Sequence, residues 1–231
     1  MPDASLQRVF DGRRENAAVD LIARTAAALR TDSGFVEART DPLGGAFLGD
    51  EAPADLSAKA LDQVLARIEA ADAFDARAAE FAAHGDSIAA EVAGLPSPLR
   101  EAALDALAND RWRLGGVGIR RLILGASGAA QAELMRIEPG FGTPAHDHTA
   151  EELTLIVTGA YDDGHAWYGP GDLTVAEPGF SHAPTALKGD ICYVLAVTYG
   201  PPRFLGLFGG LQKVLGFPWT PASRRTLSTA D

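Results

Sequence analysis

Apolar side chains in the first hundred residues recur three and four positions apart, which is the spacing of one face of an α-helix. The clearest run follows Ser57, a residue type that often caps the N-terminus of a helix. The last run ends at the Gly- and Pro-rich segment 94–98. The runs comprise Leu21, Ile22, Thr25 or Ala26, and Leu29; Leu61, Val64, Leu65 and Ile68; and Phe74, Phe81, Ile88 and Val92. We therefore predict an N-terminal helical domain over residues 1–97.

The pattern changes from about residue 111, where short apolar runs are separated by Gly, Pro and Asp. These runs cover residues 119–124, 132–137, 153–158, 173–176 and 191–198. Short strands at this pace are typical of an all-β sandwich or barrel. We predict a β-barrel domain over residues 98–218 and a tail over 219–231. The apolar positions from Phe204 to Phe217 predict a short helix packed on the barrel or on a partner.

Composition narrows the class of protein. The 231-residue chain is 47% hydrophobic and 22% charged, as expected of a folded protein with a sizeable core. It has no uncharged apolar stretch of 18 residues and no basic N-terminal region followed by an apolar run, so we expect a cytoplasmic protein without membrane contact. Its single cysteine, Cys192, excludes an internal disulfide and is expected to be a buried thiol, with a redox role as the alternative.

The charge lies mainly in the first half. The net charge is −11, with 17 acidic and 9 basic residues in 1–97 giving −8 and the remainder giving −3. An acidic surface repels phosphate backbones, so direct binding to nucleic acid is not expected. The helical half would suit a basic protein partner, although acidic side chains that only keep it soluble are an equally good interpretation.

The residues most informative about chemistry lie in segment 140–159, which reads G-x5-H-x-H-x3-E-x6-G. His146, His148 and Glu152 keep the same parity, so one face of an extended strand can present all three to one ion. His182, from a later strand, would complete the set. Three nitrogens and one oxygen suit a divalent first-row metal with an open position.

The remaining candidates have simpler explanations. His165 lies in a turn and is expected to be solvated, and His84 is expected on the surface of the helical half. Glu151 has the opposite strand parity to Glu152 and is expected to point outward. Tyr161, Trp167 and Tyr168 could line a barrel mouth, but aromatic side chains in small barrels mostly belong to the core.

The motif in 140–159 resembles the first signature of the cupin superfamily at every one of these positions. The second signature is similar as well, with Gly171, Gly179 and His182 in place, although Pro178 is shifted by one residue and Ala186 stands where many cupins have Asn. The resemblance implies a jelly-roll β-barrel whose metal lies inside the barrel mouth.

A narrower resemblance covers most of residues 98–218. Glu152-Leu-Thr-Leu-Ile-Val-Thr-Gly-Ala-Tyr, Tyr168-Gly-Pro-Gly-Asp-Leu and His182-Ala-Pro are similar to the ChrR-like anti-sigma factors, as are Arg111-Trp-Arg and Pro202-Arg-Phe. In that family a helical N-terminal domain masks an extracytoplasmic-function sigma factor, and a C-terminal cupin senses oxidative stress. The resemblance implies zinc as the metal, whereas the ligand set alone would also accept iron, manganese or nickel.

The chain departs from this family in its first half. The family's N-terminal domain binds zinc through an H-x3-C-x2-C run, which would fall near Ala26, Arg30 and Ser33. The first 83 residues contain no His or Cys. Either this domain is stabilised by packing alone, or it no longer has the function that the domain has in that family.

Three functions are compatible with these features. The first is an anti-sigma factor in which the state of the metal cupin changes the affinity of the helical half for a sigma factor. The second is a cupin metalloenzyme, a dioxygenase or isomerase acting on a small molecule with the same metal. The third is a binding module without catalysis. The acidic helical half favours the first, because a cupin enzyme does not need it. Homodimerisation is left open.

Overall fold

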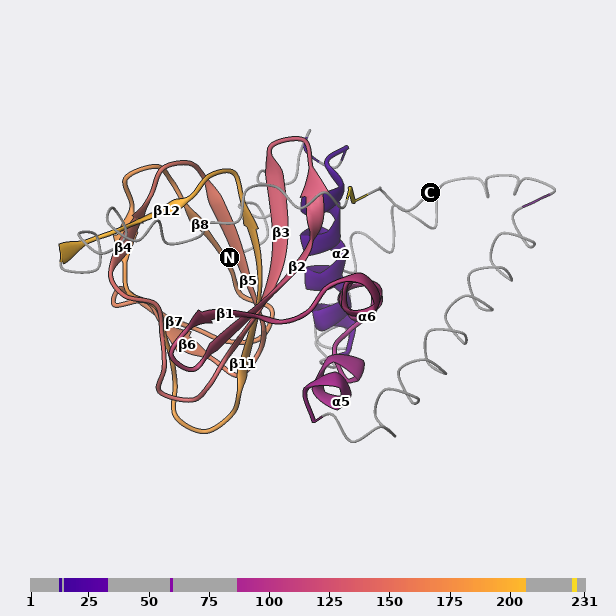
Figure 1. Ribbon diagram of the computed structural model, residues 1–231, viewed down its shortest axis with the longest axis horizontal. Helices are drawn as coiled ribbons and strands as arrows, with labels where there is room; N and C mark the ends of the chain where they lie inside the picture. The colour runs from indigo at the N-terminus through magenta and orange to yellow at the C-terminus, as the bar shows by residue number, and fades with distance from the viewer. Residues whose placement is uncertain (1–12, 14, 33–58, 60–86, 207–225, 228–231) are drawn as a thin grey trace, which may run out of the picture. The chain divides into compact units, whose positions relative to one another are not determined.

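The computed structural model describes residues 13, 15–32, 59, 87–206 and 226–227 (Figure 1). The chain divides into two compact units, one formed by Met1–Leu29 with Pro96–Asp231 and the other by Arg30–Leu95. The strands and two of the three described helices belong mainly to the first unit.

Among its described residues, the first unit contains twelve strands, which pair antiparallel in three sheets (Figure 1). A six-stranded sheet has the order β1-β2-β3-β11-β5-β8, and two three-stranded sheets have the orders β10-β6-β7 and β12-β4-β9. The strands are β1 (Arg113–Gly116), β2 (Ile119–Ser127), β3 (Ala130–Ile137), β4 (His146–His148), β5 (Glu152–Thr158), β6 (Tyr161–Asp162), β7 (Trp167–Tyr168), β8 (Leu173–Ala176), β9 (Ser181–His182), β10 (Thr185–Ala186), β11 (Cys192–Thr198) and β12 (Pro202–Phe204). The five strands predicted from apolar runs are confirmed as β2, β3, β5, β8 and β11.

The middle of the large sheet is buried on both faces. All seven residues of β11 are buried, and β5 is buried from Leu153 to Val157. This explains why the sequence shows continuous apolar runs there instead of an alternation of apolar and polar residues. One face carries Leu134, Leu155 and Leu195, each 0% exposed. The other face lines the interior of the barrel, and at its apolar end Ile119, Ile137 and Val194 form a core cluster with Tyr161.

Two helices accompany this sheet. Helix α2 (Ala17–Asp32) buries Leu21, Ile22 and Ala26, so the predicted apolar face is confirmed. Helix α6 (Leu99–Asn109) contacts β2 and was not predicted, although Leu99, Ala103 and Ala106 repeat at helical spacing. These small side chains and the Pro-rich segment before them obscured the pattern.

The second unit contributes one described helix, α5 (Ser87–Ala93), in which Ala89 and Val92 are buried. It ends at Ala93, directly before the Gly- and Pro-rich segment that predicted its end. The predicted helix after Ser57, His84 and most of the apolar segment 204–217 lie outside the described residues. The helical domain over 1–97 and the domain boundaries therefore stay predictions.

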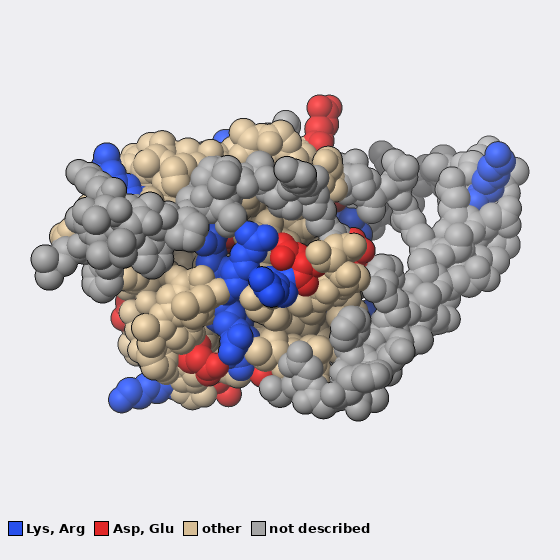
Figure 2. Space-filling view, in the orientation of Figure 1, with Lys and Arg blue, Asp and Glu red and all other residues tan. Residues whose placement is uncertain are grey.

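Two further observations concern the exterior. No helix in the described ranges is long and apolar enough to cross a membrane. Despite the net charge of −11, basic side chains gather in a strip on the face shown in Figure 2, over the region of β1 and β2, where Arg111, Arg113 and Arg120 are exposed. Charge is thus unevenly distributed over the surface of the barrel.

Gly159 and Gly128 both adopt a left-handed backbone conformation, with φ of 66° and 58°. A Cβ at Gly159 would lie 2.7 Å from the carbonyl oxygen of Ile191, whereas a Cβ at Gly128 would meet nothing within 4 Å. We predict that Gly128→Ala lowers the free energy of unfolding by about 1 kcal/mol, the cost of the left-handed conformation alone. Gly159→Ala should cost roughly 3 kcal/mol because backbone must also move. Denaturant unfolding measures both, and equal losses would contradict this account.

Candidate metal centre

The short strand β4 places two imidazoles on one side and a carboxylate on the other. His146 and His148 flank Asp147, whose oxygens accept hydrogen bonds from the guanidinium of Arg203 on β12, with Nε 2.8 Å from Oδ1. All three residues of β4 are buried. The predicted alternation of side chains along the strand is confirmed. On the side opposite the imidazoles, Asp147 and Arg203 form a bidentate ion pair that was not predicted from the sequence.

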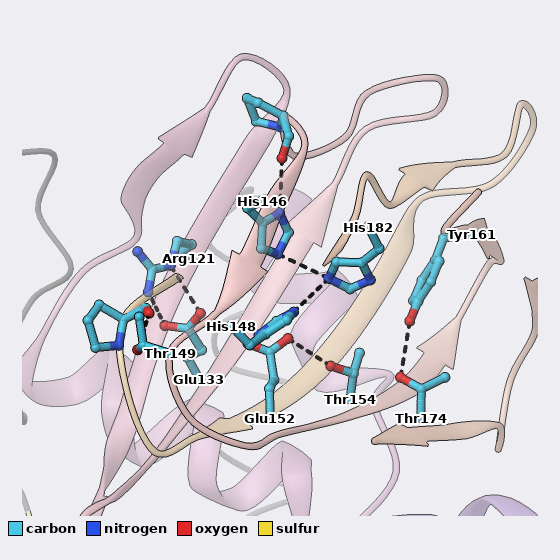
Figure 3. Close-up of polar contacts among 12 residues, drawn as sticks. Arg121, Glu133, His146, His148, Thr149, Glu152, Thr154, Tyr161, Thr174 and His182 are labelled. Carbon is cyan, nitrogen blue, oxygen red and sulfur yellow. Dashed lines mark hydrogen bonds and ion pairs between the residues drawn. The ribbon is translucent and has the colours of Figure 1, made fainter. Parts of the chain in front are cut away.

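His182 reaches the same point from β9, because its backbone pairs with that of His146. Its Nε2 lies 3.0 Å from Nε2 of His146 and 2.9 Å from Nε2 of His148. The three rings converge in Figure 3, and their ligand atoms all lie within 4.8 Å of one another. Three His could therefore hold a metal ion at this position.

The hydrogen bonding of the rings fits this use. Nδ1 of His146 lies 2.9 Å from the carbonyl oxygen of Pro144, which only accepts, so Nδ1 carries the proton and Nε2 presents its lone pair. Only one proton can be shared among the three converging Nε2 atoms, whereas a cation would satisfy every lone pair. A backbone carbonyl that orients a ligating imidazole through its other nitrogen is a usual feature of metal sites.

The electrostatics of the rings favour the neutral, ligating form. Burial, together with the neighbouring imidazoles, lowers the pKa of His148 to about 4 and that of His182 to about 3. Burial also lowers the pKa of His146, against the opposing effect of the hydrogen bond to Pro144. All three imidazoles are then neutral near pH 7, each with one ring nitrogen free of a proton, which is the state that binds a metal.

Glu152 lies beside the histidines but outside their group. Its Oε2 is 3.8 Å from Nδ1 of His148, and its Oε1 accepts a hydrogen bond of 3.0 Å from the hydroxyl of Thr154. Burial, together with the nearby carboxylate of Glu133, raises the pKa of Glu152 to about 7. The fourth ligand proposed from the sequence is thus next to the site, and its role as a ligand stays a prediction.

The barrel interior also contains an ion pair that sequence reasoning missed. Arg121 of β2 donates from Nε (3.2 Å) and Nη2 to the carboxylate of Glu133 on β3, and the side chain of Glu133 is only 6% exposed (Figure 3). Both residues line a cavity of about 120 Å³ that His146, Glu152 and His182 also line. A single Glu within the apolar run of β3 was the available signal.

Most of the other candidates take the places predicted for them, but the exposed Trp167 does not belong to the core. His165 is exposed, with Nε2 3.1 Å from the carbonyl oxygen of Ser181. Cys192 is fully buried, which raises the pKa of its thiol to about 12 and leaves almost no reactive thiolate at neutral pH. Tyr161 is buried and lines the cavity, whereas Trp167 is 74% exposed. Glu151 turns away from the histidines and forms an ion pair with Arg13.

Comparisons with known proteins agree with this architecture. The family described as the ChrR Cupin-like domain matches residues 101–201. The anti-sigma-E factor ChrR of Cereibacter sphaeroides is 33% identical over 187 residues, which cover 81% of this chain and 83% of ChrR. The crystal structure of Rhodobacter sphaeroides SigE in complex with the anti-sigma ChrR is similar with a TM-score of 0.51 and 31% identity, over 86% of this chain and 97% of that chain. The chain therefore belongs to the family of ChrR-like anti-sigma factors, with a C-terminal cupin domain.

Proposed function

We propose that this chain is a cytoplasmic transcriptional regulator that binds an extracytoplasmic-function sigma factor through its helical N-terminal region and senses stress through its cupin. One observation carries the proposal. The cupin family matches residues 101–201, but the likeness to ChrR spans 187 residues and reaches well beyond the cupin. The anti-sigma ChrR, with which this chain shares 31% identity, has been crystallised in complex with the sigma factor SigE.

We further propose that His146, His148 and His182, with Glu152 as the oxygen ligand, bind one divalent ion. Three converging neutral imidazoles, with Oε2 of Glu152 3.8 Å from Nδ1 of His148, suit zinc, the metal that the family resemblance implies. The same set of side chains would also accept iron, manganese or nickel. When bound, the ion would cross-link β4, β9 and the start of β5. Loss of the ion would then loosen three strands at once.

The N-terminal region has to fold without the family's zinc run. Ala26, near which the first ligand of that run would fall, is 4% exposed in α2, and Ile22 and Val19 are fully buried beside it. Buried apolar side chains therefore lie on the face of α2 from which a metal ligand would project. Each such side chain contributes about 1 to 2 kcal/mol, so a few of them offset part of a lost zinc clip.

The N-terminus of α2 offers a route from the metal site to this region. Asn16 caps the helix, with Oδ1 accepting from the backbone N–H of Ala18 at 3.0 Å, and its Nδ2 donates to the carbonyl oxygen of Ser127 at 2.9 Å. Arg13, just before the helix, forms an ion pair with Glu151. Glu151 directly precedes Glu152, so a shift of β5 at the metal site would move the partner of Arg13.

The direct test of the function is co-purification of the tagged chain from its native cells, with the metal content of the same sample measured by plasma mass spectrometry. We expect a stoichiometric sigma factor and about one zinc per chain. The variant with His146→Ala and His148→Ala should lose the metal and have a lower melting temperature. Absence of any sigma factor, together with bound iron or manganese, would instead favour the cupin metalloenzyme.

Metal binding should release a proton from Glu152. The pKa of this carboxyl is about 7 in the metal-free chain, so it is mostly protonated at pH 6, while His148 and His182, with pKa values of about 4 and about 3, have already lost their protons. Calorimetric zinc titrations at pH 6 in buffers of different ionisation enthalpy should therefore report release of about one proton. Glu152→Gln should lower the number of protons released by about one.

The exposed Glu177→Gln serves as the matched control for this titration and should behave as the parent chain. Undiminished proton release in Glu152→Gln would remove Glu152 from the ligand set. It would leave the three histidines as the metal site.

We expect the Arg13–Glu151 contact to couple metal binding to sigma-factor binding and to contribute little to the stability of the fold. Both side chains are partly exposed, at 43% and 26%, so the pair should add little to the free energy of unfolding. We predict that removing the metal changes the affinity for the sigma factor by roughly 5- to 150-fold, and that Arg13→Ala or Glu151→Ala brings this ratio close to one. Calorimetry of the parent chain and variants with the captured sigma factor measures the ratio.

Arg24→Ala is the control for this experiment. It removes an ion pair with Asp20 on the same helix, at 3.6 Å, and should leave the ratio unchanged. If the ratio of sigma-factor affinities with and without metal were unchanged in both Arg13→Ala and Glu151→Ala, this contact would be excluded as the route of coupling.

A further inference from the structure

The cavity inside the barrel changes from polar to apolar along its length. On β3, Glu133 lies toward one end of the cavity, with Gln131 next beyond it on the same strand face, and Met135 and Ile137 lie toward the other end. Strand pairing places Thr198 of β11 opposite Gln131 and Val194 opposite Met135. Thr198 also pairs with Glu152 on β5. The polar layer therefore lies at the level of the metal site, and the apolar layer lies beyond it.

The polar end contains hydrogen-bonding capacity that the protein does not use. Thr198 is 5% exposed, and its Oγ1 is buried without a hydrogen-bond partner among the described residues. Thr143 Oγ1, which also lines the cavity, is in the same state, again within the described part of the chain. A buried hydroxyl left unbonded costs on the order of 1 to 3 kcal/mol, so these groups point to an occupant that bonds to them.

The charged groups favour an anionic occupant once the metal is bound. Glu133 engages Nε and Nη2 of Arg121, and this pairing does not use Nη1. Without metal, the cavity holds one cationic side chain, Arg121, against two carboxylates, Glu133 and Glu152. A divalent ion makes this sum positive even when both carboxylates are ionised, and in a largely apolar barrel the excess charge favours a counter-ion.

We propose that this cavity binds a small aliphatic carboxylate, and that the metal-loaded cupin thereby senses an organic acid. The carboxylate lies at the polar end, against the metal, Arg121 and the hydroxyl of Thr198. The aliphatic body lies against Ile137, Val194 and Ile119. A volume of about 120 Å³ corresponds to roughly four water molecules and limits the ligand to a short chain. The inference rests on the metal site proposed above.

The test uses the full chain loaded with zinc, whose metal content is measured first. Butyrate is titrated by calorimetry, beside butanol and butylamine of similar length. We expect saturable binding of one butyrate per chain, much weaker binding of the other two, and no binding of butyrate to the metal-free chain. Equal binding of butylamine, or butyrate that fails to saturate at millimolar concentration, would overturn the proposal.

Two variants locate the ligand. Thr198→Val keeps the shape of the side chain and removes the unused hydroxyl, so butyrate affinity should fall about five- to tenfold at unchanged zinc content. Thr158→Val is the matched control, because the hydroxyl of Thr158 donates to the carbonyl oxygen of Ile191 at 3.1 Å and does not line the cavity. Butyrate affinity unaltered in Thr198→Val would refute the assigned position.

The second variant combines Arg121→Met with Glu133→Leu, because removing both partners leaves no buried charge unpaired. It should keep zinc and lose at least tenfold in butyrate affinity; an unchanged affinity would count against the proposal. A parent chain that holds no metal would refute the metal site and this inference together. A chain that holds zinc and recruits the sigma factor but binds no butyrate would refute this inference alone.

Discussion

The convergence of three imidazole nitrogens on one point is the constraint on which the site depends. Nε2 of His182 lies within 3.0 Å of the same atom in both other rings, and burial keeps the rings neutral. Lone pairs held this close repel one another unless a cation lies between them. The backbone pairing of β4 with β9 enforces the arrangement, since His146 is directly opposite His182 in the ladder. An ion bound between the three rings would satisfy all of these lone pairs at once.

The parity of a strand made the histidines predictable from sequence alone. His146 and His148 are two residues apart, and an extended chain must present them on the same side. Strands β5 and β11 were predictable for a different reason, because a strand buried on both faces is a continuous apolar run. His182 was proposed as the ligand that completes the set, and the cupin resemblance supported this choice. No local pattern encodes its position beside the other two histidines, because the pairing of β4 with β9 is a long-range contact.

What could not be predicted depends on side chains that meet across strands. Parity places Glu152 on the correct face, yet in the structure its carboxylate bonds to Thr154 and lies outside the histidine group. The Arg121–Glu133 and Asp147–Arg203 pairs join residues 12 and 56 positions apart, and only the register of the sheets brings them together. Helix α6 was missed because its buried face consists largely of alanine, whose small side chain gives a weak hydrophobic period.

The absence of the family's zinc run from the first 83 residues changes how an anti-sigma factor of this kind can transmit a signal. With a zinc clip, an N-terminal domain would have its own internal cross-link and could keep its shape whatever happened in the cupin. In this chain the described contacts of the N-terminus of α2 are with the cupin, through Asn16 to Ser127 and Arg13 to Glu151. A helix stabilised through the barrel responds to any change in the barrel. Packing in place of zinc would then make α2 depend more strongly on the barrel, which is what the sensing role proposed above requires.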